Sequence, residues 1–207
     1  MARKDSTVKQ HILATTVALI SDLGSEKVRI ADIARQASVG VPTIYYHFDS
    51  RSKLLAEAQV LRYEESMAPL RKLVDQIEES VSRRDEPVFW RAINEFVASV
   101  WEPSRIDDKF EVGRWLMDDS VDQFMRDRFL EIMDDQYRRW LDVVCAAQTL
   151  GWIYPALDCA ALTSLFWAAS VGQVMTTNSA YQRLTPESAV ALFQSIVRTP
   201  VKDVPRP

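Results

Sequence analysis

Residues 30–55 of the chain read IADIARQASVGVPTIYYHFDSRSKLL, and this stretch predicts two short helices joined by a tight turn. The first helix is expected over residues 29–37, where apolar side chains recur at helical spacing. The Ser-Val-Gly-Val segment at 38–41 interrupts that pattern, and Pro42 stands where a proline starts a helix. A second helix from Pro42 to His47 completes a pair with the proportions of a helix-turn-helix.

The second helix of this pair is short and polar, and burial alone does not explain its composition. Only Ile44 is clearly needed by a core, whereas its neighbours crowd hydrogen-bonding groups onto less than two turns. Such groups suit contacts with phosphate oxygens and base edges. Arg51 and Lys53 follow at the start of the next helix, where free backbone N–H groups also favour a phosphate. A structural role remains an alternative for His47, Tyr45 and Tyr46.

The charge of the chain is distributed unevenly along the sequence. The net charge of −4 alone argues against a protein that binds nucleic acid. Residues 1–53, however, carry eight Lys or Arg against five Asp or Glu, so this portion is basic and the remainder is acidic. A small basic portion joined to an acidic body is typical of a protein that binds a polyanion through one end.

Residues 33–55, with Thr-Ile-Tyr-Tyr-His-Phe at 43–48, closely resemble the DNA-binding signature of the tetracycline-repressor (TetR) family. The resemblance extends over about residues 10–56. It implies an all-α fold: an N-terminal three-helix DNA-binding domain with a helix-turn-helix, joined by a long helix to a helical-bundle domain for ligand binding and dimerisation. The expected boundaries are 1–53 for the first domain and 54–198 for the second, followed by a frayed tail at 199–207.

The resemblance also assigns the DNA contacts. It places Val41, Pro42 and Thr43 in the major groove and Tyr46 near the bases or the sugar edge. The phosphate contacts that it implies are those of Tyr45, His47 and Arg51, with Lys53 as a further candidate. Arg29 stands where the family often has a small hydroxyl residue, and its longer side chain still reaches a phosphate.

Helical periodicity predicts about nine helices in the whole chain and no convincing strand. Ser6 is expected to cap the first helix, Gly24 to end it, and a long fourth helix is expected from Arg51 towards Arg83 with a kink near Pro69. The other helices are expected over 86–101, in short pieces over 105–118, and over 121–150, 157–177 and 185–198.

The second domain is rich in large aromatic side chains and methionine between residues 86 and 176. In the family the corresponding helices enclose a ligand pocket, which implies a small effector of apolar or aromatic character. Aromatic residues at helical spacing more often form a core, so both interpretations stay open for each side chain. The candidate ligand-binding residues are Trp115, Phe129, Met133, Tyr137 and Trp167.

No residue from Cys159 to Gln182 is charged, but the segment is too polar for a membrane span. We expect the helices over 157–177 and 185–198 to pair with their copies in a homodimer, because an uncharged face needs a partner in a soluble protein. The expected interface residues are Ala160, Ala161, Ala168, Ala169, Gly172, Leu192, Phe193 and Ile196.

The sequence therefore predicts a cytoplasmic repressor that binds a palindromic operator as a homodimer and is released by a small molecule. No membrane contact, cofactor, metal or catalytic residue is expected, since no histidine follows His47 and adjacent carboxylates on a helix diverge. Cys145 and Cys159 have no CxxC spacing and are expected to be small buried side chains. The alternatives are a helical protein-interaction module without DNA binding and an enzyme.

Overall fold

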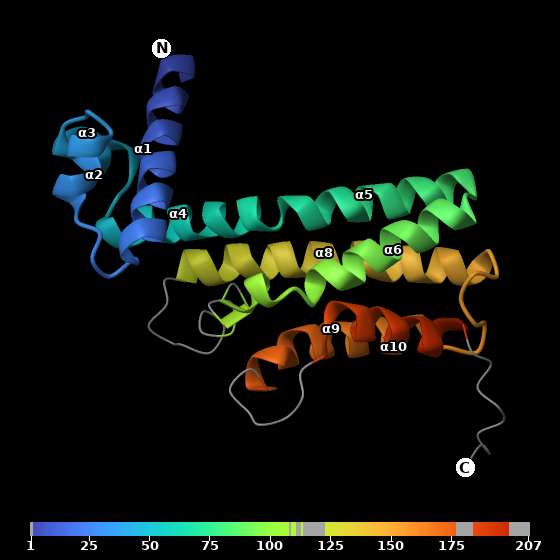
Figure 1. Cartoon of the computed structure of the whole chain (residues 1–207). Coiled ribbons are helices and arrows are strands. Elements are labelled where there is room, and N and C mark those ends of the chain that lie inside the picture. Colours follow the sequence, from blue (N-terminus) through green and yellow to red (C-terminus); the bar gives the residue numbers. More distant parts are fainter. Residues whose placement is uncertain (1, 108, 111–112, 114–122, 177–183, 199–207) are drawn as a thin grey trace. The chain divides into compact units, whose positions relative to one another are not determined.

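The computed structural model describes residues 2–107, 109–110, 113, 123–176 and 184–198 (Figure 1). Within these ranges the chain consists of helices joined by turns and loops and has no strand, so the predicted all-α fold is confirmed. The helices are α1 (Ala2–Leu23), α2 (Ile30–Gln36), α3 (Val41–His47), α4 (Arg51–Ser66), α5 (Ala68–Arg83), α6 (Glu86–Val100), η1 (Pro103–Arg105), α8 (Gln123–Thr149), α9 (Cys159–Thr176) and α10 (Pro186–Arg198).

The chain divides into two compact units. Unit 1 comprises Met1–Met67 and Asp118–Glu131, and unit 2 comprises Ala68–Met117 and Ile132–Pro207. Unit 1 thus includes α4, which the sequence analysis placed in the second domain. Helix α8 contributes its first residues to unit 1 and the rest to unit 2.

Unit 1 has a small core of its own, formed where α1 packs against α2, α3 and α4. Each of the four helices contributes a fully buried aliphatic side chain to its centre: Ile12, Ile33, Ile44 and Leu54. The buried Thr16 hydroxyl donates to the Ile12 carbonyl oxygen at 2.7 Å, so this polar group is satisfied within α1. The core fixes the position of α3 through Ile44.

Several helix ends differ from the predicted ones. Helix α1 begins at Ala2, so the prediction that Ser6 caps it is wrong, whereas Gly24 ends it as expected, with a φ of +79°. The predicted fourth helix is two helices, α4 and α5, separated at Met67. Pro69 explains the break, because a proline is tolerated in the first turn of a helix but not in its interior.

An aromatic cluster forms much of the core of unit 2. Phe166 of α9 lies at its centre, with ring centroids 5.3 Å from Trp140 of α8 and 5.2 Å from Trp101. Phe96 of α6 stacks on Trp140 at 4.5 Å, and Phe193 of α10 meets Phe166 edge-on at 5.7 Å. Four helices therefore share one set of ring contacts, and these rings are packed core.

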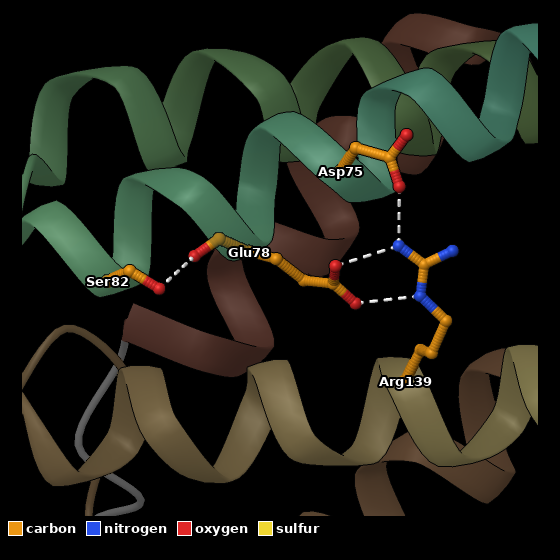
Figure 2. Close-up of polar contacts among 4 residues, drawn as sticks. All are labelled: Asp75, Glu78, Ser82 and Arg139. Atoms are coloured by element: carbon orange, nitrogen blue, oxygen red, sulfur yellow. Dashed lines mark hydrogen bonds and ion pairs between the residues drawn. The ribbon is translucent and has the colours of Figure 1, made fainter.

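Helices α5 and α8 are also joined by ion pairs in unit 2 (Figure 2). The Arg139 guanidinium donates to both carboxylate oxygens of Glu78, each at 2.7 Å, and to Asp75 Oδ1 at 2.6 Å. These two acids, Glu78 first, hold the pKa of Arg139 above its ordinary value. A bidentate pair of this kind fixes the orientation of the two helices.

Lys109 is a charged side chain set against the aromatic cluster. Its ammonium donates to the Val100 carbonyl oxygen at 2.6 Å and to Gln173 Oε1 at 2.8 Å, and it lies 5.6 Å from the centroid of the Trp101 ring. Burial, together with the charge of Arg105, lowers the pKa of Lys109 to about 8.

This pKa predicts that unit 2 becomes more stable as the pH rises. Between pH 8 and the ordinary lysine value of 10.5, the unfolded chain keeps a proton on Lys109 that the folded chain has lost, so the free energy of unfolding increases. We expect the wild type to gain on the order of 1–2 kcal/mol relative to Lys109→Gln between pH 7 and 10, after allowance for solvent screening. Chemical denaturation of both proteins at each pH measures this difference. The same change in the free energy of unfolding with pH for wild type and Lys109→Gln would contradict this prediction.

No helix within the described ranges is long and apolar enough to cross a membrane.

Candidate nucleic-acid interface

Helix α3 is held in place by its ends and by a single buried side chain. Gly40 is its N-cap in an extended conformation, and Pro42 occupies the first turn, where its missing N–H is not needed. Phe48, which is buried, ends the helix. Between these ends only Ile44 reaches the core, at 0% exposure. The other side chains of α3 are therefore available to a ligand.

The exposed side chains of α3 are those that the sequence analysis assigned to DNA. Tyr46 is 75% exposed and Tyr45 is 48% exposed, so neither mainly covers the core. Val41 and Pro42 are exposed as well, and Thr43 is half-buried. One helix of unit 1 thus presents two phenols, a hydroxyl and two apolar contacts to the outside, which is the mixture that reads base edges and phosphates.

His47 lies at the border between this surface and the core. Its ring is half-buried, with its centroid 5.1 Å from that of Tyr46 and 6.4 Å from that of Phe48, in edge-on geometry. His47 therefore contacts both an exposed ring and a core ring, and a phosphate contact by its imidazole remains a prediction.

Arg51 lies at the start of α4, but its guanidinium is engaged within unit 1. Its Nε and Nη2 donate to the Val28 carbonyl oxygen at 3.1 and 2.8 Å, and Nη2 also lies 3.2 and 3.3 Å from the carbonyl oxygens of Ser25 and Glu26. These carbonyls belong to the loop between α1 and α2. Arg51 therefore holds that loop in the structure. The sequence analysis expected only a phosphate contact for this residue.

Three further cations of unit 1 belong to α2, its N-cap and the start of α4. Lys53 forms an ion pair with Asp49 at 2.5 Å, and the hydrogen bond and charge of Lys53 lower the pKa of Asp49. A phosphate has to displace Asp49 to use Lys53. Arg29 is exposed at the N-cap of α2, where the free N–H groups of the helix add to its attraction for an anion. Arg35 pairs with Asp32 on the surface of α2 at 2.6 Å.

The described residues among the predicted ligand-binding residues are divided between the two units. Phe129 belongs to unit 1, where it is fully buried and its ring centroid lies 4.7 Å from that of Tyr63. Tyr137 and Trp167 belong to unit 2: the Tyr137 hydroxyl lies 2.9 Å from Ser164 Oγ, and Trp167 packs on the aromatic cluster. Met133, in unit 2, is half-buried, and Trp115 lies outside the described residues.

The sequence analysis did not single out the buried indoles of unit 2. Among the described residues, Trp101 Nε1 and Trp140 Nε1 are buried N–H donors without a hydrogen-bond partner. Their rings both contact Phe166, so they belong to the same aromatic cluster. Helical spacing alone could not distinguish these two tryptophans from the other aromatic residues of the domain.

The predicted interface residues fall into two classes. Five small residues of α9 and one leucine of α10 are exposed within the chain: Ala160, Ala161, Ala168, Ala169, Gly172 and Leu192. Ile196 is half-buried, and Phe193 is only 7% exposed because it packs in the aromatic cluster. Phe193 therefore belongs to the core of unit 2. The exposed face of α9 also includes Leu165, at 58%, and Met175, at 74%, which the sequence analysis did not name.

Comparison with known families identifies the N-terminal part of the chain. Residues 12–58 match the family "Bacterial regulatory proteins, tetR family". This range runs from the middle of α1 to the middle of α4 and includes all of α2 and α3. Residues 12–58 are thus similar to the N-terminal domain of tetR-family regulators. The resemblance seen in residues 10–56 is thereby confirmed, and DNA binding through a helix-turn-helix follows from the family.

Solved structures of transcriptional regulators share the fold over nearly the whole chain. A putative transcriptional regulator from Saccharomonospora viridis, in complex with choline, is 22% identical with a TM-score of 0.62, over 92% of this chain and 95% of that one. A TetR/AcrR regulator from Thermobifida fusca is 11% identical with a TM-score of 0.63, over 92% and 96%. FadR from Bacillus subtilis, in complex with stearoyl-CoA, is 16% identical with a TM-score of 0.51, over 90% and 94%. A search of curated protein sequences gives no match.

Proposed function

We propose that this protein is a tetR-family repressor that binds a palindromic operator as a homodimer and leaves it when a small apolar or aromatic molecule binds unit 2. The exposed surface of α3 is the observation that carries the proposal. That helix uses one side chain, Ile44, for the core and exposes the remainder, Tyr46 most of all. A helix with so little burial contributes little to stability, and its composition fits a surface kept for DNA.

The exposed face of α9 supports the homodimer. Alanine and glycine residues on this face allow two backbones to approach closely, and Leu165 and Met175 add apolar surface. Among the described residues of α9 none is charged. A face of this kind is typical of a protein interface, and a two-fold axis through it would relate two copies of α3. A dimer of this symmetry binds a palindromic site.

Structural neighbours support control by a ligand. One neighbour was solved with choline and another with stearoyl-CoA. The aromatic side chains of unit 2 in this chain suit an apolar or aromatic molecule. Such a molecule releases the operator only if it binds the DNA-incompetent arrangement more tightly, and a coupling of about 1–3 kcal/mol changes operator affinity by about 5- to 150-fold.

Substitutions on α3 test the assignment of this helix to DNA. We expect Thr43→Ala to weaken binding to the preferred operator by on the order of 1–3 kcal/mol and to relax preference at one base position in each half-site. Fluorescence anisotropy with a set of operator variants measures both effects. Thr149→Ala serves as the matched control, because Thr149 is an exposed helical threonine of unit 2. Equal loss for all operator variants would show that Thr43 reads no base.

A further inference from the structure

The two cysteines of the chain, which the sequence analysis treated as separate core residues, belong to adjacent segments of unit 2. Cys145 lies near the C-terminal end of α8, and Cys159 is the first residue of α9. Both are free thiols and both are half-buried, so neither is sealed inside the core. The loop over residues 150–158 returns the chain from one to the other.

Hydrogen bonds around Gln148 bring the two thiols to the same place. The Cys159 thiol donates to Gln148 Oε1 at 3.1 Å. Gln148 follows Cys145 by three residues on α8, so their side chains lie on one face of the helix. The amide of Gln148 also donates to the Tyr154 and Leu157 carbonyl oxygens, at 3.1 and 2.6 Å, and thereby folds the loop back against α8.

The position of Gln148 brings Cys145 and Cys159 close to each other. The Cys159 thiol reaches the Gln148 side chain, and Gln148 lies one turn of α8 after Cys145. Both thiols therefore lie beside the same turn of α8, on two different elements. Burial is the main cause that raises the pKa of the Cys159 thiol, to about 11.

We propose that Cys145 and Cys159 are a reversible dithiol site, at which a low-molecular-weight disulfide oxidises the pair to an intramolecular disulfide between α8 and α9. The hydrogen bond from Cys159 to Gln148, one turn after Cys145 on α8, brings the two thiols near enough for a disulfide to be tested. The new bond replaces the hydrogen bond from Cys159 to Gln148 and ties the loop covalently at both ends.

The reaction proceeds in two exchanges. The Cys145 thiolate, its proton having passed to solvent, attacks one sulfur of oxidised glutathione, the S–S bond breaks, and one glutathione leaves as a thiolate that takes up a proton. Cys159 then gives its proton to solvent, attacks the Cys145 sulfur and displaces the second glutathione. Two protein thiols are oxidised, and one disulfide is reduced to two glutathione thiols. Cys145 is assigned the first attack because the Cys159 thiol donates its proton to Gln148 Oε1, and this hydrogen bond holds Cys159 in the thiol form.

The test uses the native full-length protein and oxidised glutathione at pH 7.5, followed by intact mass and peptide mapping. We expect the wild type to lose two hydrogens, about 2 Da, and to yield a cross-linked peptide that contains both cysteines. Dithiothreitol should restore both thiols. Cys159→Ser should stop as a single glutathione adduct on Cys145, whereas Cys145→Ser should react about tenfold more slowly than Cys159→Ser.

Two results would overturn the proposal. One is accumulation of separate glutathione adducts on the two cysteines, or of disulfide-linked pairs of chains, in place of the internal bond. The other is unreacted thiols in the native protein under conditions where the urea-unfolded protein is modified at both cysteines. Circular dichroism of each serine variant is the control for folding. A variant with the wild-type spectrum is folded, so its reaction cannot be assigned to misfolding.

Discussion

Ala169→Glu is expected to convert the proposed dimer to a monomer and to weaken operator binding at least about 100-fold. Ala169 is exposed on α9 of the single chain, so the substitution leaves the core of unit 2 intact. In the proposed dimer it buries two unpaired carboxylates next to each other, at a cost on the order of 3–5 kcal/mol. Sedimentation velocity at micromolar protein concentration measures the association, and fluorescence anisotropy with operator DNA measures the binding.

Ala156→Glu is the matched control, since Ala156 is an exposed alanine in the loop between α8 and α9. It should leave both association and operator affinity unchanged. Phe193→Glu is a contrasting variant, because this side chain packs against Phe166 and its replacement should unfold unit 2. A folded Ala169→Glu protein that still sediments as a dimer would show that α9 does not form the interface.

Arg51→Ala is expected to loosen unit 1, with a loss of about 1.5–3 kcal/mol in its local stability. The guanidinium donates to three carbonyl oxygens of the loop between α1 and α2 and so ties that loop to α4. Binding to all DNA sequences should fall together, because a less ordered unit 1 positions α3 poorly. All six tryptophans lie beyond residue 67, so hydrogen exchange over residues 1–67 is the appropriate measurement.

The control for Arg51→Ala is Arg35→Ala. Arg35 makes an exposed ion pair with Asp32 within α2, and pairs of this kind contribute only about 0.3–0.5 kcal/mol. Its hydrogen exchange should match the wild type. A different result for Arg51→Ala would contradict its role in holding the loop. Unchanged exchange, combined with a salt dependence of DNA binding reduced by about one unit, would mean that Arg51 contacts a phosphate as the sequence resemblance implied.

The helix-turn-helix could be predicted from sequence because its signals are local. Gly40 and Pro42 determine the start of α3 through their own backbone chemistry, and both do so in the structure. The break at Met67 was harder to place, because Pro69 is compatible either with a kink inside one helix or with the first turn of another. The structure has the second arrangement.

Long-range contacts were the part that sequence could not predict. Arg51 is a basic residue at a helix start, which fits a phosphate contact equally well, and only the folded loop places Val28 and its carbonyl beside it. Phe193 has the helical spacing of an interface residue, yet its ring meets Phe166 of another helix. No pattern in the sequence indicates that Cys159 lies near the end of α8 that carries Cys145. That proximity depends on how the loop over residues 150–158 folds.

Selection of binding sites from a random duplex library, followed by native mass spectrometry of the selected complex, tests most directly whether a dimer reads a palindrome through α3. The account predicts enriched sites with two inverted half-sites, complexes with an even number of subunits, and no enrichment with Tyr46→Ala. Enrichment of a single half-site by one subunit, or the same enriched site with Tyr46→Ala, would contradict it.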